Sequence, residues 1–216
     1  MRIWLFIPLL CLVGCSPASR ESAPGANAPP AALAVAVQDA AIKRGKAVAA
    51  ETFALLSANL QSAIQSGGVS NALPFCSLAA SPLTASMAEK HGVTLKRVTH
   101  KPRNPTAKAD AEELAVLQAF EAALITTTNP PAPFATNLVS GQATFFAPIV
   151  INNELCLKCH GEPGRDISIA DLAIIRQHYP QDQATGFRFG QLRGAWRIDF
   201  PLGSLNPEPQ TAAQTP

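Results

Sequence analysis

The chain has 216 residues, of which 47% are hydrophobic and 15% charged, and its length predicts one domain with tails. Its 17 basic and 15 acidic residues give a formal net charge of +2, which argues against binding to nucleic acid or to an anionic membrane through charge. A polytopic membrane protein is excluded, because the apolar residues form only one run longer than ten, at the N-terminus.

Residues 1–15 are predicted to be a lipoprotein signal peptide. Arg2 precedes eleven apolar residues at 3–13, which as a helix would span about 16 Å, too short for a bilayer. The run ends in Leu12-Val13-Gly14-Cys15, which resembles the lipobox of bacterial lipoproteins. This resemblance implies cleavage before Cys15 and lipidation of its thiol. The alternative is an ordinary secretory signal.

The lipid on Cys15 is expected to anchor the mature chain to a membrane outside the cytoplasm. Because Ser16 rather than aspartate follows Cys15, we expect the periplasmic face of the outer membrane if the host is Gram-negative. Otherwise the outer face of the cytoplasmic membrane is expected. Residues 16–32 lack aromatic and β-branched side chains and predict a disordered Pro/Ala/Ser tether, and the tail at 204–216 has the same character.

Two helices are predicted to open the folded domain, which is expected to cover residues 33–203. Residues 33–66 contain no proline, carry apolar side chains at three- and four-residue spacing, and end at Gly67-Gly68. Gly45 could divide this stretch into two helices. A further helix is expected from about Leu73 to Lys90.

The remainder is predicted to mix strands with two more helices. Strands are expected at 93–98, 144–151 and 192–200. In the last of these, apolar residues at even positions alternate with Arg193, Arg197 and Asp199, the period of a half-buried strand. The whole order of elements predicts an α+β fold over an antiparallel sheet.

Two helix starts carry capping signals. Asp110 with Glu113 resembles a capping box and predicts a helix to about Ile125. Ser168 with Asp171 predicts another capped helix that ends before Tyr179.

The motif that carries the chemistry is Cys156-Leu157-Lys158-Cys159-His160. Its spacing is typical of covalent c-type haem attachment, in which two thiols add to the two vinyl groups of the porphyrin. The adjacent histidine then supplies an imidazole ligand to the iron. The sequence therefore predicts one covalent haem c held by Cys156, Cys159 and His160. Export agrees with this prediction, because c-type haem is attached outside the cytoplasm.

Three other chemistries use two cysteines at this spacing. A structural zinc site needs four ligands, and the sequence lacks a second Cys/His pair at similar spacing. A redox-active disulfide would open a helix, which Gly161, Pro163 and Gly164 interrupt almost at once. A plain structural disulfide is the third alternative. Haem attachment is favoured over all of them.

The second iron ligand has several candidates in the sequence: Met87, His91, His100, His178 and Cys76. Cys76 is the cysteine left over once haem takes two and lipid takes one. A free cysteine more often behaves as a small buried hydrophobe. The three histidines, likewise, are more often ordinary hydrogen-bonded or exposed side chains that bind no metal.

Several separated motifs resemble the PAS-like c-type haem family. They are Phe75-Cys76-Ser77, residues 97–105 ending in Arg-Asn-Pro, residues 154–161, and residues 179–186 followed by Gly194-Ala195. The likeness covers roughly residues 40–200 and implies a PAS-like antiparallel sheet packed by helices. It also implies that the iron is held by His160 and by the thiolate of Cys76. The chain departs from many relatives at Thr106-Ala107, where they carry asparagine.

Basic residues near the second motif are candidates for the haem propionates. Arg97, Lys101 and Arg103 could pair with these carboxylates, because a guanidinium binds a carboxylate through two hydrogen bonds. The alternative is a solvated basic loop. Arg193 and Arg197 are weaker candidates for the same role.

The leading functional hypothesis is a lipid-anchored mono-haem protein that transfers electrons or senses redox state through a partner protein. A haem sensor of nitric oxide or carbon monoxide, in which the gas displaces Cys76, is the second hypothesis. A haem peroxidase is the third hypothesis. It would need a distal His–Arg pair, and none can be assigned in this sequence. An enzymatic role is therefore not the expectation, and neither is a nucleic-acid partner.

Overall fold

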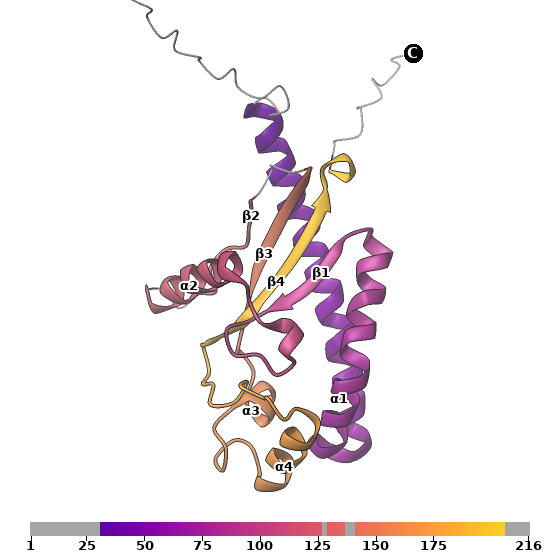
Figure 1. The fold of residues 1–216 in the computed structure, drawn as a ribbon, viewed down its shortest axis with the longest axis vertical. Coiled ribbons are helices and arrows are strands. Elements are labelled where there is room, and N and C mark those ends of the chain that lie inside the picture. The colour runs from indigo at the N-terminus through magenta and orange to yellow at the C-terminus, as the bar shows by residue number, and fades with distance from the viewer. Residues whose placement is uncertain (1–30, 127–128, 137–140, 206–216) are drawn as a thin grey trace, which may run out of the picture.

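The computed structural model describes residues 31–126, 129–136 and 141–205. Within these ranges a long helical element, α1 (Ala31–His91), lies beside a four-stranded antiparallel sheet (Figure 1). The strands are β1 (Thr94–Val98), β2 (Phe134–Thr136), β3 (Gln142–Val150) and β4 (Leu192–Pro201). The other helices are α2 (Ala111–Thr126), α3 (Glu154–His160) and α4 (Ile169–His178), with short 3₁₀ turns at Pro105–Ala107 and Leu202–Ser204. The predicted α+β class is confirmed.

The predicted signal peptide, Cys15, most of the tether and most of the tail lie outside the described residues. Among the residues that are described, no helix has the length and apolar character needed to cross a membrane.

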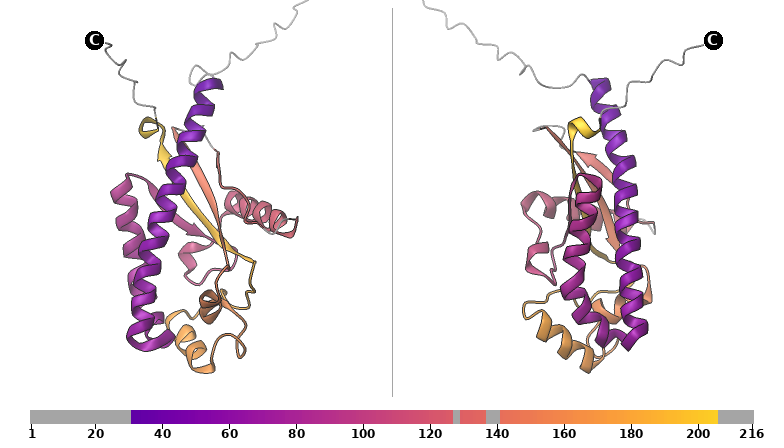
Figure 2. Two further views of the ribbon diagram at one scale, coloured as in Figure 1. Left: turned by 180° about the vertical axis from the view of Figure 1, so that it is seen from behind. Right: turned by 90° about the vertical axis from the view of Figure 1, so that its right-hand side faces the viewer.

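The α1 element is two helices joined by a turn at Gly67-Gly68, so the predicted helix stop is confirmed. Gly68 has a φ of 75°, a conformation that favours glycine, and the Asn71 side-chain amide donates to the Ala63 carbonyl oxygen at 3.0 Å across the turn. The second arm therefore runs back beside the first (Figure 2). The division considered at Gly45 is wrong. Gly45 lies inside the first arm, where a Cβ would come within 2.3 Å of the Phe145 ring.

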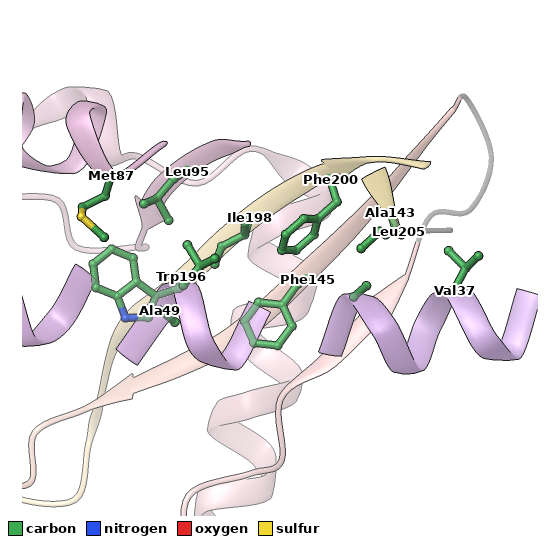
Figure 3. Close-up of a cluster of buried hydrophobic side chains, with 12 residues drawn as sticks. Val37, Ala49, Met87, Leu95, Ala143, Phe145, Trp196, Ile198, Phe200 and Leu205 are labelled. Carbon is green, nitrogen blue, oxygen red and sulfur yellow. The ribbon is translucent and has the colours of Figure 1, made fainter. Parts of the chain in front are cut away.

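The sheet has the order β1-β4-β3-β2 and separates two apolar layers. On one face, Phe145, Trp196 and Phe200 pack against α1 in the main core cluster (Figure 3). On the other face, Phe146 packs with Phe120 of α2 in a smaller cluster. The three predicted strands are confirmed. The short β2 was missed, because three residues after a proline-rich segment are too few to show alternation.

Both predicted helix caps are present. The Asp110 N–H donates to Glu113 Oε2 at 3.0 Å, and the Glu113 N–H donates to Asp110 Oδ1 at 2.9 Å, which is a reciprocal capping box. At the start of α4, the Asp171 N–H donates to Ser168 Oγ at 3.0 Å. Local chemistry therefore sets where α2 and α4 begin.

The folded region extends slightly beyond the predicted bounds of 33 and 203. The α1 helix begins at Ala31. At the other end Leu205 is 2% exposed in the α1 core cluster, and the Arg44 guanidinium donates to the Ser204 carbonyl oxygen at 2.5 Å. Residues 204 and 205 thus belong to the domain rather than to the predicted tail, because the core covers the Leu205 side chain.

Candidate functional site

A cavity of about 560 Å³ lies between the two arms of α1, the end of the sheet and α3. This volume falls in the range of roughly 300–1,000 Å³ that small-molecule and cofactor sites occupy. The structure brings most of the residues predicted for the site to this cavity. Its walls include Cys76, Arg97, Arg103, Cys156, Cys159 and His160.

The two cysteines of the motif lie one helical turn apart on α3. Asn153 caps this helix by accepting the Leu155 N–H at 2.8 Å, and Gly161 ends it. Cys156 and Cys159 are both free and half-buried. Positions three residues apart lie on the same face of a helix, so both thiols can serve one ligand in the cavity.

The His160 ring is held in one tautomer by the backbone. Its Nδ1 lies 2.8 Å from the Ala184 carbonyl oxygen. Because a carbonyl only accepts, we assign the proton to Nδ1, which leaves the Nε2 lone pair for a metal. Burial lowers the pKa of His160 well below its ordinary value, and the charges of Arg193 and Arg103 lower it further. The ring is therefore neutral, as a ligating imidazole must be.

Cys76 lines the cavity from the second arm of α1. Burial raises the pKa of its thiol above the ordinary value, although Arg97 and Arg103 act in the opposite direction. Burial also raises the pKa of Tyr179, another wall residue, which Cys76 influences electrostatically. Cys76 is thus a sulfur donor at the cavity in a mainly protonated state.

The other candidates for a second ligand are placed elsewhere, and all of them lie in the described residues. Met87 is 5% exposed in the main core cluster, beside Trp196. His91 Nε2 lies 2.8 Å from a Glu51 carboxylate oxygen, and His100 Nδ1 lies 3.5 Å from Glu121. Neither these three residues nor His178 belongs to the cavity wall.

Two arginines reach the cavity without a carboxylate at ion-pair distance in the described part of the chain. Arg97 lies over the Trp196 ring, 5.9 Å from its centroid, and is open to the cavity. Arg193 donates through Nη1 to Thr99 Oγ1 at 3.0 Å, while its buried Nε lacks a hydrogen-bond partner among these residues. Burial, with Arg103 and Arg97 nearby, lowers the pKa of Arg193 to about 10.

The remaining basic candidates have protein partners. Arg103 lines the cavity but forms an ion pair with Asp182 at 3.0 Å. Lys101 Nζ donates to the Thr185 carbonyl oxygen at 3.1 Å, and Lys101 is not part of the cavity wall. Arg197 pairs with Glu113 at 2.8 Å on the α2 side of the sheet.

Comparison with known proteins identifies the family. The family model described as Tll0287-like matches residues 31–201. The chain belongs to the Tll0287-like family. The comparison with curated proteins found no match. Among solved structures, the fold resembles one whose description reads "Crystal structure of the cyanobacterial heme-protein Tll0287", and the TM-score is 0.53. Identity is 24%, over 74% of this chain and 94% of that chain.

Part of the cavity wall of this Tll0287-like chain was visible in the sequence only as the apolar face of a helix. Phe53, Leu56, Leu60 and Ile64 form the apolar stripe that predicted the first helix, and all four line the cavity. Phe53 remains 58% exposed. Periodicity shows that a helix face is apolar, but only the course of the second arm shows what that face meets. Trp196 and Tyr179 also line the wall. The sequence predicted Trp196 only as part of a strand and Tyr179 only as part of a family motif.

Proposed function

We propose that this chain binds one haem covalently through Cys156 and Cys159, with His160 as an iron ligand. The observation that carries the proposal is that these three residues line one cavity of cofactor size. The residues present fit haem. The free thiols match its vinyl groups, the neutral imidazole its iron, the apolar walls its porphyrin ring and the unpaired guanidinium groups its propionates. The similar solved structure is described as that of a heme-protein, which adds support.

Each residue has a distinct task. The thiols of Cys156 and Cys159 would hold the porphyrin as thioethers, each by addition of its S–H across one vinyl group with no leaving group. His160 binds iron through Nε2 while its Nδ1–H is held by the Ala184 carbonyl, which orients the ring. Cys76 would supply the second ligand as a thiolate, for which its thiol would have to give up its proton. Bound haem supplies one-electron redox chemistry.

Arg97 and Arg193 are the better candidates for the propionates. Both reach the cavity with unpaired charge, and a buried polar group left without a partner costs about 1–3 kcal/mol. A propionate would satisfy such a group. Arg103 is already neutralised by Asp182, and Lys101 lies outside the cavity wall, so the geometry favours them less.

The physiological role that fits best is electron transfer or redox sensing outside the cytoplasm, with the chain anchored to a membrane through lipid on Cys15. Thiolate ligation by Cys76 favours ferric iron. Cys76 also lies shortly after the turn at Gly67-Gly68, so a change at the Fe–S bond would act directly on the second arm of α1. Either role requires a partner protein.

The test is the double variant Cys156→Ala/Cys159→Ala, exported in a host that attaches haem c. The native protein should carry haem through a denaturing gel stained for peroxidase activity and give a haem c spectrum in the pyridine haemochrome assay. The double variant should give no stain. Cys76→Ala is the matched control, because it removes a cavity thiol that takes no part in attachment. Covalent haem in the double variant, or none in the native protein, would refute the proposal.

A further inference from the structure

The Arg103 side chain connects three separate segments beside His160. Its Nε donates to Asp182 Oδ1 at 3.0 Å, and its Nη2 donates to the Cys159 carbonyl oxygen at 2.6 Å. The same Nη2 lies 3.3 Å from Asp182 Oδ2 and 3.4 Å from the Ala184 carbonyl oxygen. The two side chains are only 12% and 7% exposed, so water screens this pair weakly.

Asp182 holds the residue whose carbonyl binds His160. The Ala184 N–H donates to Asp182 Oδ1 at 3.0 Å, and Ala184 itself is fully buried. The next residues join the end of α3, because the Phe187 N–H donates to the His160 carbonyl oxygen at 2.9 Å. The neighbouring Gln183 N–H donates to the Pro102 carbonyl oxygen at 2.9 Å. The loop that carries Ala184 is thus fastened both to α3 and to the segment that carries Arg103.

We propose that Arg103 and Asp182 are positioning residues for His160 rather than propionate ligands. Together they fix the Ala184 carbonyl, which accepts the Nδ1–H of the imidazole and sets the plane of the ring. This inference rests on the proposed haem function and deepens it. A carbonyl that accepts the Nδ1–H makes the imidazole a stronger donor to the metal. Weakening the clamp should therefore destabilise ferric iron and raise the reduction potential.

Asp182→Asn perturbs the clamp from outside the cavity wall, and Arg103→Lys, which keeps the charge, separates loss of the clamp from loss of a negative charge near the cavity. Changes in the partners of a metal-binding histidine typically alter metal affinity by about 10–100-fold. A tenfold change in the ratio of ferric to ferrous binding corresponds to about 59 mV for one electron. We expect an upward shift of that order and an altered ferric absorption spectrum, with covalent haem retained.

Asp199→Asn is the matched control. Asp199 is also a buried aspartate paired with an arginine, Arg197 at 3.1 Å, but it faces α2 and lies outside the cavity wall. It should lower stability in urea without moving the potential. Arg103→Lys is the second variant, because lysine keeps the charge but lacks the planar guanidinium that donates to both Asp182 oxygens. It should shift the potential in the same direction as Asp182→Asn.

The outcomes separate this inference from the haem proposal. If the native protein carries no covalent haem, the proposed function fails. If haem-loaded Arg103→Lys or Asp182→Asn keeps the native potential and ferric spectrum, or if Asp199→Asn shifts them equally, the positioning role is overturned while haem binding stands. If Asp182→Asn does not accumulate, Arg103→Lys against Asp199→Asn decides the question alone.

Discussion

Replacing Glu113 by glutamine tests whether a buried charge cluster holds α2 on the sheet. The carboxylate is fully buried, and its Oε1 lies 2.6 Å from Lys96 Nζ and 2.8 Å from Arg197 Nη1. Glutamine preserves the shape and can still accept the Asp110 N–H, but it leaves both cations without this anion. Deleting one member of a buried ion pair costs about 3–5 kcal/mol. Lys96 is 42% exposed and Arg197 also pairs with Asp199, so a loss of about 2 kcal/mol, as for a charged hydrogen bond, is expected.

The effect of Glu113→Gln should depend on pH. Burial alone would raise the pKa of Glu113, but hydrogen bonds from Lys96, the Asp110 N–H and Arg197 outweigh it and hold the pKa below the usual 4.5. The contribution of the carboxylate to stability is therefore present above the unfolded-state pKa and is lost as pH falls through the folded-state pKa. The difference between native protein and variant should shrink in acid.

Urea unfolding at pH 7 and at a series of lower pH values measures this difference. Glu89→Gln is the matched control, because Glu89 is an exposed glutamate on α1 without an ion pair in the described part of the chain. It should change the free energy of unfolding by less than about 0.5 kcal/mol. A loss for Glu113→Gln that is equally large at every pH, or no larger than that of the control, would refute the reasoning.

Three further predictions concern packing, ligation and anchoring. Gly45→Ala should lower the free energy of unfolding by about 1–3 kcal/mol, measured by thermal unfolding, because the new Cβ meets the Phe145 ring. The double variant with Phe145→Leu should lose less than the sum of the two single losses, because the smaller side chain leaves room for that Cβ. Cys76→Ala should shift the ferric spectrum toward high spin and raise the potential with covalent haem unchanged; an unaltered spectrum would make Cys76 a packing residue. Cys15→Ser should abolish lipid labelling, and unchanged membrane retention of that variant would contradict the lipoprotein proposal.

The parts of the fold that the sequence predicted are those set by neighbouring residues. The reciprocal bonds of Asp110 and Glu113 span three residues, so their pattern is legible without tertiary structure. The stop at Gly67-Gly68 is equally local, because glycine alone tolerates the backbone of that turn readily. The Cys156–His160 motif is legible for the same reason, since the spacing of its two cysteines matches one helical turn.

Alternation along β4 was only partly informative. Trp196, Ile198 and Phe200 do share the α1 face, as predicted. Leu192 was expected on that face too, but it packs with Phe146 on the other. The cause is an irregular register between β3 and β4 opposite Gly194, where a Cβ would lie 2.4 Å from the Val98 carbonyl oxygen. Such a register shift depends on the neighbouring strands and leaves little local signal.

The contact between Arg103 and Asp182 could not be predicted from the sequence. Arg103 and Asp182 are 79 residues apart, and each reads as an ordinary charged loop residue. The family resemblance placed both within shared motifs but could not say that they bind each other. The assignment of Arg103 to a propionate followed from its charge alone, whereas its partners in the structure follow from the path of three loops.

The charges around the cavity narrow the kind of ligand that it suits. Among the described residues its wall carries Arg97, Arg103, Arg193 and Lys158, and no acidic side chain. Asp182, from behind the wall, neutralises Arg103. An apolar setting makes unpaired charge expensive, so a purely apolar ligand would leave Arg97 and Arg193 uncompensated. A flat apolar ring bearing two carboxylates matches both the apolar walls and the excess positive charge. That complementarity is independent of the Cys-x-x-Cys-His motif, and it favours the same ligand.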